Sequence, residues 1–370
     1  MKRAIVCVTN DLVTDQRVHK TCNALIKSGF EVTVVGRKLP ESLPLHREYQ
    51  TKRFRLLFNK SALFYAEYSL RLFLYLLFHP ASLLFANDLD TLAAAWMAKK
   101  IKNCALIYDS HEFFTHTPEL IHRKKIQKIW LCIEKFIFPK ISDVITVNES
   151  IAALYKEKYG NTLHVVRNIP PEIPLTSPRS RQELGIPTEK KMILLQGAGI
   201  NIHRGAEEAV IAMKEVDNAV LCIIGSGDVF PLLPTLIHDH QLEGKVILLP
   251  RQTPEMLRNY TRLADLGLSI DKDTNLNYHF SLPNKLFDYI HSGVPVIASR
   301  LPEIERVITA YDIGAFIPGH QPGQIAQTLN QALADEVQYN RWKKNIQRAA
   351  QELRWEEEEK ILLAIFERYG

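Results

Sequence analysis

The stretch from Ser281 to Ile297 reads SLPNKLFDYIHSGVPVI and contains one helix with both its start and its stop signal. Pro283 suits the first turn of a helix, and Gly293 suits the position just past its end. Leu286 and Ile290 are four residues apart, so they give this helix an apolar face. An apolar run follows directly. The stretch therefore predicts a helix that packs on a sheet and leads into a strand of that sheet.

The same alternation of short apolar strands and amphipathic helices runs through the chain. Strands are predicted at 4–9, 31–35, 83–86, 105–109, 144–147, 192–196, 220–224, 246–249, 266–270 and 294–298, and helices at 17–28, 91–100, 206–215, 254–263 and 283–292. A proline-rich segment, 169–178, separates two such series. Strand–helix alternation indicates parallel sheets, so we expect an α/β protein of two Rossmann-like domains, 1–168 and 179–345, with their sheets facing across a cleft.

The composition excludes several classes of protein. The 370 residues are 46% hydrophobic and 24% charged, which is typical of a globular chain and not of a disordered or fibrous one. Five scattered cysteines without a Cys-x-x-Cys pair indicate neither a disulfide framework nor a zinc site. No secretory signal precedes the first strand, and the apolar stretch 62–78 is interrupted by Glu67 and Arg71. We therefore expect a cytoplasmic protein.

Charge is unevenly distributed. Residues 1–170 carry an excess of ten positive charges, and the rest of the chain an excess of five negative ones. Cations alternate with aromatic residues at 52–78 and 123–130, a pattern that suits either a helix on an anionic membrane surface or a buried helix under a basic rim. No nucleic-acid-binding motif accompanies the charge, so nucleic acid is not an expected partner.

Two segments of the rear half are suited to a diphosphate. Lys285 lies in the first turn of the helix at 283–292, where free amides and the helix dipole attract anions, and Asp288 lies one turn further, where it can accept hydrogen bonds from a ribose. The alternative is a solvated ion pair on an ordinary helix. Arg204, beside Gly205 at a second helix start, can grip two phosphate oxygens or lie along the helix end.

These segments resemble family 4 glycosyltransferases of the GT-B fold, which use a nucleotide diphosphate-sugar and retain anomeric configuration. The resemblance covers Gln196–Gly205, Val220–Gly227, Ala264–Leu268 and Ser281–Ile297 in order and spacing. It extends more loosely to Asp15–Val34, Asn87–Thr91 and Tyr108–Glu112. It also implies that the last segment, 346–370, contains a helix that crosses back to the first domain.

The resemblance also implies site residues. Arg204 and Lys285 would clamp the donor diphosphate, Asp288 would take the place of a ribose-binding glutamate, and His111 would contact the donor sugar. Catalytic residues are therefore expected at His111, Arg204 and Lys285; donor-binding residues at Gly199, Arg204, Asn284, Lys285, Leu286 and Asp288; and acceptor-binding residues at Asp15 and Glu112. Asp15 and Arg17 can equally pair within their own domain, and His111 can be a capping or surface residue.

This sequence departs from the family pattern at two places. Phe280 stands where the first of two glutamates would fall, and the first loop lacks two adjacent glycines. The Asp-x-Asp triplets Asp88–Asp90 and Asp271–Asp273 are weak signals for a metal, because chance yields such triplets. We expect neither a metal nor another cofactor, since cations and a helix dipole neutralise the leaving group in proteins of this kind.

The predicted function is transfer of a sugar to a glycan or lipid-linked acceptor in surface polysaccharide or glycolipid synthesis. The enzyme would act in the cytoplasm or on the inner face of the membrane. Two other functions are compatible with the same architecture. One is a nucleotide-sugar epimerase, which needs no acceptor, and the other is a binding partner without catalytic activity.

Overall fold

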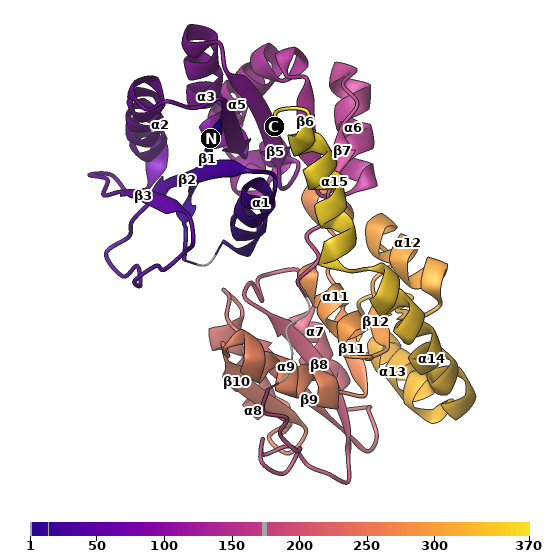
Figure 1. Cartoon of the computed structure of the whole chain (residues 1–370). Coiled ribbons are helices and arrows are strands. Elements are labelled where there is room, and N and C mark those ends of the chain that lie inside the picture. The colour runs from indigo at the N-terminus through magenta and orange to yellow at the C-terminus, as the bar shows by residue number, and fades with distance from the viewer. Residues whose placement is uncertain (1, 14, 172–175) are drawn as a thin grey trace. The chain divides into compact units, whose positions relative to one another are not determined.

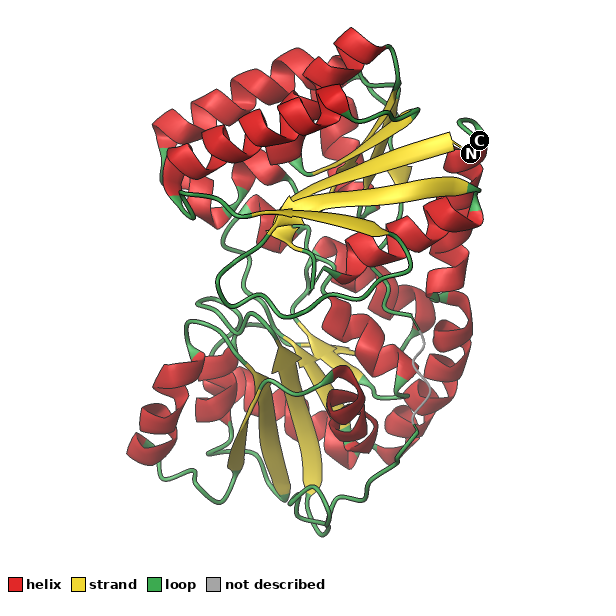
Figure 2. Ribbon diagram, turned by 60° about the vertical axis from the view of Figure 1, so that its left-hand side comes forward, coloured by secondary structure: helices red, strands yellow, loops and turns green. Residues whose placement is uncertain are grey.

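The structure is a computed structural model that describes residues 2–13, 15–171 and 176–370. It contains two compact units, the first formed by Met1–Asn168 with Glu356–Gly370 and the second by Ile169–Trp355 (Figure 1). In each unit, helices cover both faces of a sheet (Figure 2). No helix within the described residues is long and apolar enough to cross a bilayer.

Unit 1 contains a sheet of seven parallel strands in the order β3-β2-β1-β4-β5-β6-β7. The strands are β1 (Lys2–Asp11), β2 (Phe30–Arg37), β3 (Gln50–Phe54), β4 (Leu83–Asn87), β5 (Ala105–Ser110), β6 (Asp143–Thr146) and β7 (His164–Val165). The helices are α1 (Gln16–Lys27), α2 (Ser61–Phe78), α3 (Leu89–Lys102), α4 (Pro118–Ile121), α5 (Lys124–Ile137) and α6 (Glu149–Tyr159). The strand order reverses between β1 and β4, so the loops after these strands meet at one edge.

Unit 2 contains a six-stranded parallel sheet in the order β10-β9-β8-β11-β12-β13. Its strands are β8 (Lys191–Gly197), β9 (Ala219–Gly225), β10 (Val246–Pro250), β11 (Leu266–Ser269), β12 (Val296–Ala298) and β13 (Gly314–Phe316). Its helices are α7 (Ala206–Ala212), α8 (Leu233–Asp239), α9 (Pro254–Leu263), α10 (Leu276–His279), α11 (Asn284–His291), α12 (Pro302–Tyr311), α13 (Pro322–Ala334) and α14 (Glu336–Glu352). Here the order reverses between β8 and β11.

The last helix, α15 (Trp355–Glu367), returns the chain to unit 1. Glu359 pairs with Lys27 of α1 at 2.7 Å, and Phe366 packs edge-on against Phe85 of β4. The segment 346–370 thus differs from the single terminal helix expected of it. Its first residues complete α14 and group with unit 2, because Ile346 and Ala349 are buried in the core of that unit.

The helix in the opening stretch forms as α11, one residue shorter at each end than predicted. Leu286, Tyr289 and Ile290 are fully buried against the sheet of unit 2. Gly293 follows with φ +69°, a left-handed conformation that glycine adopts without strain. The local signals therefore position this helix, and the apolar spacing decides which side faces the core. Lys285 and Asp288 remain on the side toward the loops.

Candidate active site

The loops that follow β8 and β11 are held in close contact at the carboxyl edge of the unit 2 sheet. The backbone N–H of Lys272 donates to the carbonyl of His203 at 2.8 Å. Gly205 has φ +80°, and a Cβ there would lie 2.5 Å from the carbonyl oxygen of Ile270. Only glycine combines that conformation with so close an approach. The loop contacts therefore place Arg204 next to the residue that follows Ile270.

That residue is Asp271, and it lies between the two cations that the sequence singled out. Arg204 Nη1 is 3.3 Å from Asp271 Oδ2, and Lys285 Nζ is 3.7 Å from Asp271 Oδ1. The Asp271 side chain is fully buried. Both contacts are ion pairs, longer than ordinary hydrogen bonds, and neither carboxylate oxygen accepts a hydrogen bond. The Arg204 guanidinium also lies over the ring of Tyr278, 4.2 Å from its centre.

Arg204, Lys285 and Asp271 together have a formal net charge of +1. Burial lowers the pKa of Lys285, the Asp271 carboxylate acts in the opposite direction, and Arg204 adds to the lowering. The net result is a pKa below the ordinary value for lysine. An anion bound here would bring back the stabilisation that burial removes from the ammonium group. The cluster is therefore suited to a phosphate.

Asp288 lies one turn along α11 and belongs to a second group, which is held together by hydrogen bonds. Gln196 Nε2 donates to Asp288 Oδ2 at 2.9 Å, and Thr261 Oγ1 donates to Gln196 Oε1 at 2.7 Å. Burial raises the pKa of Asp288 to about 6, against the smaller opposing effects of Gln196 and Arg258. A carboxyl group in this state gains from any ligand that donates hydrogen bonds to it.

The other predicted donor-binding residues lie close by but differ in exposure. Gly199 and Asn284 are exposed, on the loop after β8 and at the first residue of α11. Leu286 is fully buried in the core, and its backbone N–H already donates to Pro283 O at 3.1 Å. The structure therefore gives the Leu286 side chain a packing role, because the apolar face of α11 includes it.

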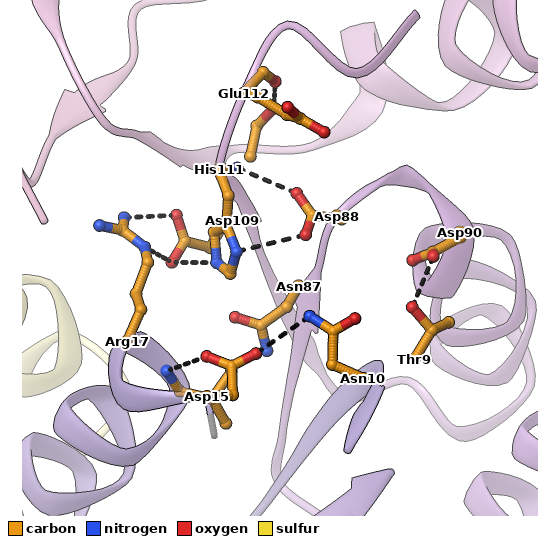
Figure 3. Close-up of polar contacts among 12 residues, drawn as sticks. Thr9, Asn10, Asp15, Arg17, Asn87, Asp88, Asp90, Asp109, His111 and Glu112 are labelled. Carbon is orange, nitrogen blue, oxygen red and sulfur yellow. Dashed lines mark hydrogen bonds and ion pairs between the residues drawn. The ribbon is translucent and has the colours of Figure 1, made fainter. Parts of the chain in front are cut away.

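In unit 1, His111 lies between two carboxylates at the carboxyl edge of the sheet (Figure 3). Its Nδ1 is 3.2 Å from Asp88 Oδ2, and its Nε2 is 3.3 Å from Asp109 Oδ2. The backbone N–H of His111 donates to Asp88 Oδ1 at 3.0 Å. Asp88 itself has φ +58°, a conformation that costs a residue with a side chain on the order of 1–3 kcal/mol. This strained residue directly follows β4 and is held by its contacts with His111.

Asp109 also makes a two-pronged pair with Arg17 of α1. Arg17 Nε and Nη2 donate to its two oxygens at 2.9 and 2.7 Å, and Nη1 donates to the carbonyl of Val166. Burial acts to raise the pKa of Asp109, but Arg17 and His111 outweigh it and hold that pKa well below the ordinary value. Burial acts to lower the pKa of His111. Asp88 and Asp109 have the larger, opposite effect, so the pKa of His111 lies well above 6.5. The two carboxylates therefore favour the imidazolium form of His111.

The two predicted acceptor-binding residues have different surroundings. Asp15 accepts from the backbone N–H of Val18 and so caps α1, and its other oxygen accepts from Asn10 Nδ2. Its carboxylate thus has a structural role, one of the two readings that its sequence left open. Glu112 is exposed, directly after His111.

The two Asp-x-Asp triplets are each divided between separate partners. Asp88 pairs with His111, whereas Asp90 accepts a hydrogen bond from Thr9 Oγ1 at 2.6 Å, and burial raises its pKa to about 7. Asp273 pairs with His279, apart from Asp271. Across 2–13, 15–171 and 176–370, no three His, Cys, Asp or Glu side chains are grouped as metal ligands.

Two family models match the chain, one in each unit. Residues 15–171 match "Glycosyltransferase Family 4", and residues 176–349 match "Glycosyl transferases group 1". The chain belongs to the family 4 glycosyltransferases of the GT-B fold. The first match contains His111 with both of its carboxylates, and the second contains Arg204, Asp271 and Lys285. Each unit of this glycosyltransferase thus has one charged cluster at the carboxyl edge of its sheet.

Individual relatives of this glycosyltransferase are distant. D-inositol 3-phosphate glycosyltransferase of Xylanimonas cellulosilytica is 22% identical over 60% of this chain and 58% of its own length. Among solved structures, sucrose-phosphate synthase of Thermosynechococcus elongatus has a TM-score of 0.79 at 18% identity, covering 100% of this chain and 98% of that one. HepE of Anabaena, crystallised with UDP-glucose, has a TM-score of 0.74 at 14% identity, with complete coverage of both chains. These structures share the GT-B fold.

Proposed function

We propose that this glycosyltransferase moves a sugar from a nucleoside diphosphate-sugar to a glycan or lipid-linked acceptor, with retention of anomeric configuration, in surface polysaccharide or glycolipid synthesis. The observation that carries the proposal is the meeting of Arg204, from the loop after β8, and Lys285, from the first turn of α11, at the point where the strand order of unit 2 reverses. Ligands of doubly wound sheets bind at such points. A site with excess positive charge there fits a diphosphate.

Unit 2 would hold the nucleotide of the donor. Arg204 and Lys285 bind the diphosphate oxygens, and the free N–H groups at the start of α11 add the positive end of a helix dipole. Asp288 accepts hydrogen bonds from the ribose hydroxyls. UDP-glucose in HepE, a protein of the same fold, supports a donor of this class. Phe280 stands where family members carry a first glutamate, so the sugar hydroxyls find a different surface here.

The chemical step needs only these charges and an acceptor hydroxyl. The bond between the anomeric carbon and the diphosphate oxygen breaks, and negative charge develops on that oxygen, where Arg204 and Lys285 stabilise it. The acceptor oxygen forms the new bond on the same face of the sugar, and its proton passes to the departing phosphate. His111 would contact the donor sugar as an imidazolium. No metal or other cofactor is part of the proposal.

The acceptor side of the proposal rests on unit 1. Helix α3 packs against both α2 and α5, and the outer surface of the three helices is apolar and basic. We call this surface the apolar–basic face. It is formed by the exposed side chains of Leu63, Leu70, Leu74 and Phe78 on α2, Met97 and Ile101 on α3, and Ile129 and Phe136 on α5, with the exposed lysines Lys100, Lys125, Lys128, Lys135 and Lys140.

Such a surface fits an anionic bilayer better than water. Phe78 and Ile101 are 76% and 63% exposed, and Lys140 Nζ lies 3.2 Å from the centre of the Phe136 ring. Apolar side chains that enter the headgroup region and lysines that stay at its surface together give peripheral binding. We therefore propose a lipid-linked acceptor reached from the membrane surface. Flotation with vesicles of anionic or neutral phospholipid tests this part separately.

The experiment that tests the function starts with a thermal-shift panel of UDP, GDP and ADP and of their common sugar conjugates. A ligand that binds only the folded protein raises its melting temperature, and at a hundredfold excess over Kd it adds about 2.7 kcal/mol. The donor found in this way is then incubated with and without lipid extract. Product that forms only with the extract supports transfer. Isomerised donor without an acceptor indicates an epimerase, and binding without any turnover indicates a non-catalytic partner.

A further inference from the structure

Asp271 is a carboxylate inside a site suited to anions, and the proposed chemistry gives it no role. It is fully buried, and its two oxygens face Arg204 and Lys285 at 3.3 and 3.7 Å. Neither oxygen accepts a hydrogen bond. A buried carboxylate without hydrogen bonds is costly for the fold, and the ion pairs with the two cations offset part of that cost.

The same geometry places Asp271 close to any phosphate that the two cations bind. A phosphate oxygen and an Asp271 oxygen would then share the same ammonium and guanidinium groups. They would be separated by no more than about two hydrogen-bond lengths. At that range, and in a site that excludes part of the solvent, like charges repel appreciably.

Substrate and product of the proposed reaction differ in the charge that meets this carboxylate. In a nucleoside diphosphate-sugar, each phosphate has one ester bond and one anhydride bond and therefore carries one charge. In the released nucleoside diphosphate, the terminal phosphate has a second ionisable oxygen, which is mostly ionised at pH 7–8. Repulsion by Asp271 is therefore stronger for the product than for the substrate.

We propose that the charge of Asp271 weakens binding of the product nucleoside diphosphate more than it weakens binding of the donor. Without that charge, Arg204 and Lys285 would hold the product more tightly relative to the donor. Asp271 acts through electrostatic repulsion and through its hold on Arg204 and Lys285, and it takes no part in bond making. This inference rests on the proposed function, since it presumes a diphosphate at these two cations.

The test compares two dissociation constants in matched variants. Asp271→Asn keeps the shape and removes the charge. Asp273→Asn makes the same change two residues away on the same loop, where the side chain is 56% exposed and pairs with His279. For each protein, calorimetry measures the Kd of the best nucleoside diphosphate of the UDP, GDP and ADP panel and the Kd of its sugar conjugate.

In Asp271→Asn we expect the Kd of the nucleoside diphosphate to fall roughly tenfold or more. The Kd of its sugar conjugate should fall by a factor that is at least about three times smaller. Turnover then falls through slower product release, while KM for the donor does not rise. Asp273→Asn leaves both constants near their wild-type values. If Asp271→Asn does not fold, Asp271→Ser, which removes the charge and leaves room for water, is measured in its place.

Two results would overturn the inference. Either the two constants change by the same factor, or both ligands bind more weakly, which would mean that Asp271 only orients the cations. A wild-type protein that binds none of the three nucleoside diphosphates would contradict the proposed function itself, whatever the variants do.

Discussion

The carboxyl edges of the two sheets carry charged clusters of opposite character. In unit 1, Arg17 and His111 are matched by Asp109 and Asp88. Three of the contacts are hydrogen bonds of 2.7 to 3.0 Å, and the two ring nitrogens of His111 form ion pairs at 3.2 and 3.3 Å. In unit 2, Arg204 and Lys285 share the single carboxylate of Asp271 at longer distances. A charge-balanced network of this kind fixes the shape of its surroundings. A cluster with an unmatched cation is stabilised when an anion binds to it.

The largest effect should come from breaking the balanced cluster. Arg17→Met removes the two-pronged partner of the buried Asp109 carboxylate and leaves it only the contact with His111, which should cost about 3–5 kcal/mol in the free energy of unfolding. Urea denaturation of the full chain, followed by circular dichroism, measures the loss. The control is Arg3→Met, which removes an exposed pair with Glu31 and costs at most about 1 kcal/mol. Equal losses in the two variants would contradict the assignment of a structural role to Arg17.

Breaking the unmatched cluster should lower turnover. Lys285→Ala and Arg204→Ala should each lower turnover about a hundredfold, because each removes a group that stabilises charge on the leaving phosphate. That factor equals about 2.7 kcal/mol of activation free energy. Lys191→Ala, at the other end of β8 with an exposed pair to Asp265, serves as the control. Near-normal rates in both site variants would remove the proposed mechanism.

A smaller effect is expected at Asp288 of unit 2, where one substitution should raise stability and weaken donor binding. The pKa of Asp288 is raised to about 6, above its unfolded value of 3.8, so the wild-type protein loses stability as pH rises from about 4 through 6. Asp288→Asn should therefore be more stable than wild type by about 1–2 kcal/mol at pH 7.5, equal to it near pH 3.5, and weaker in binding the donor. Denaturation over this pH range measures the difference. A difference that does not change with pH would argue against the raised pKa.

The smallest effect concerns His111. Its pKa is raised in the folded state, so its contribution to stability is fully present below the unfolded value of about 6.5 and is lost as pH rises through the folded value. His111→Gln should therefore destabilise most near pH 6 and progressively less at alkaline pH. The same substitution at the exposed His238 is measured for comparison. A difference for His111 that does not change with pH would mean that its two carboxylates do not hold it as a cation.

Local sequence signals predicted the elements that carry these clusters well. Helix α9 begins at Pro254 and ends at Leu263 as expected, since Thr253 caps it through the N–H of Met256 and proline occupies its first position. The strands that were missed, β3, β7 and β13, are short or mostly exposed. A run such as Gln50–Phe54 has too little apolar alternation to be recognised, and it becomes a strand by pairing with β2.

The candidate site was predicted in part. The resemblance pointed to Arg204 and Lys285, and the structure brings them together. It did not point to Asp271 as the group between them, because an Asp-x-Asp triplet suggests a metal and gives no sign of a buried ion pair. Pairing within its own domain was one of the two interpretations of Arg17, but nothing in the sequence indicated Asp109, 92 residues away, as the partner.

By itself, the sequence determined the parallel two-series architecture, the position of α11 and the family. These depend on spacings of three to ten residues, over which backbone geometry and apolar periodicity act directly. Only the tertiary structure decided which charged side chains form pairs. The strand order brings residues from separate loops to one edge, and burial there turns ordinary carboxylates and cations into partners whose charges depend on one another. That coupling acts through space, so the order of residues along the chain does not contain it.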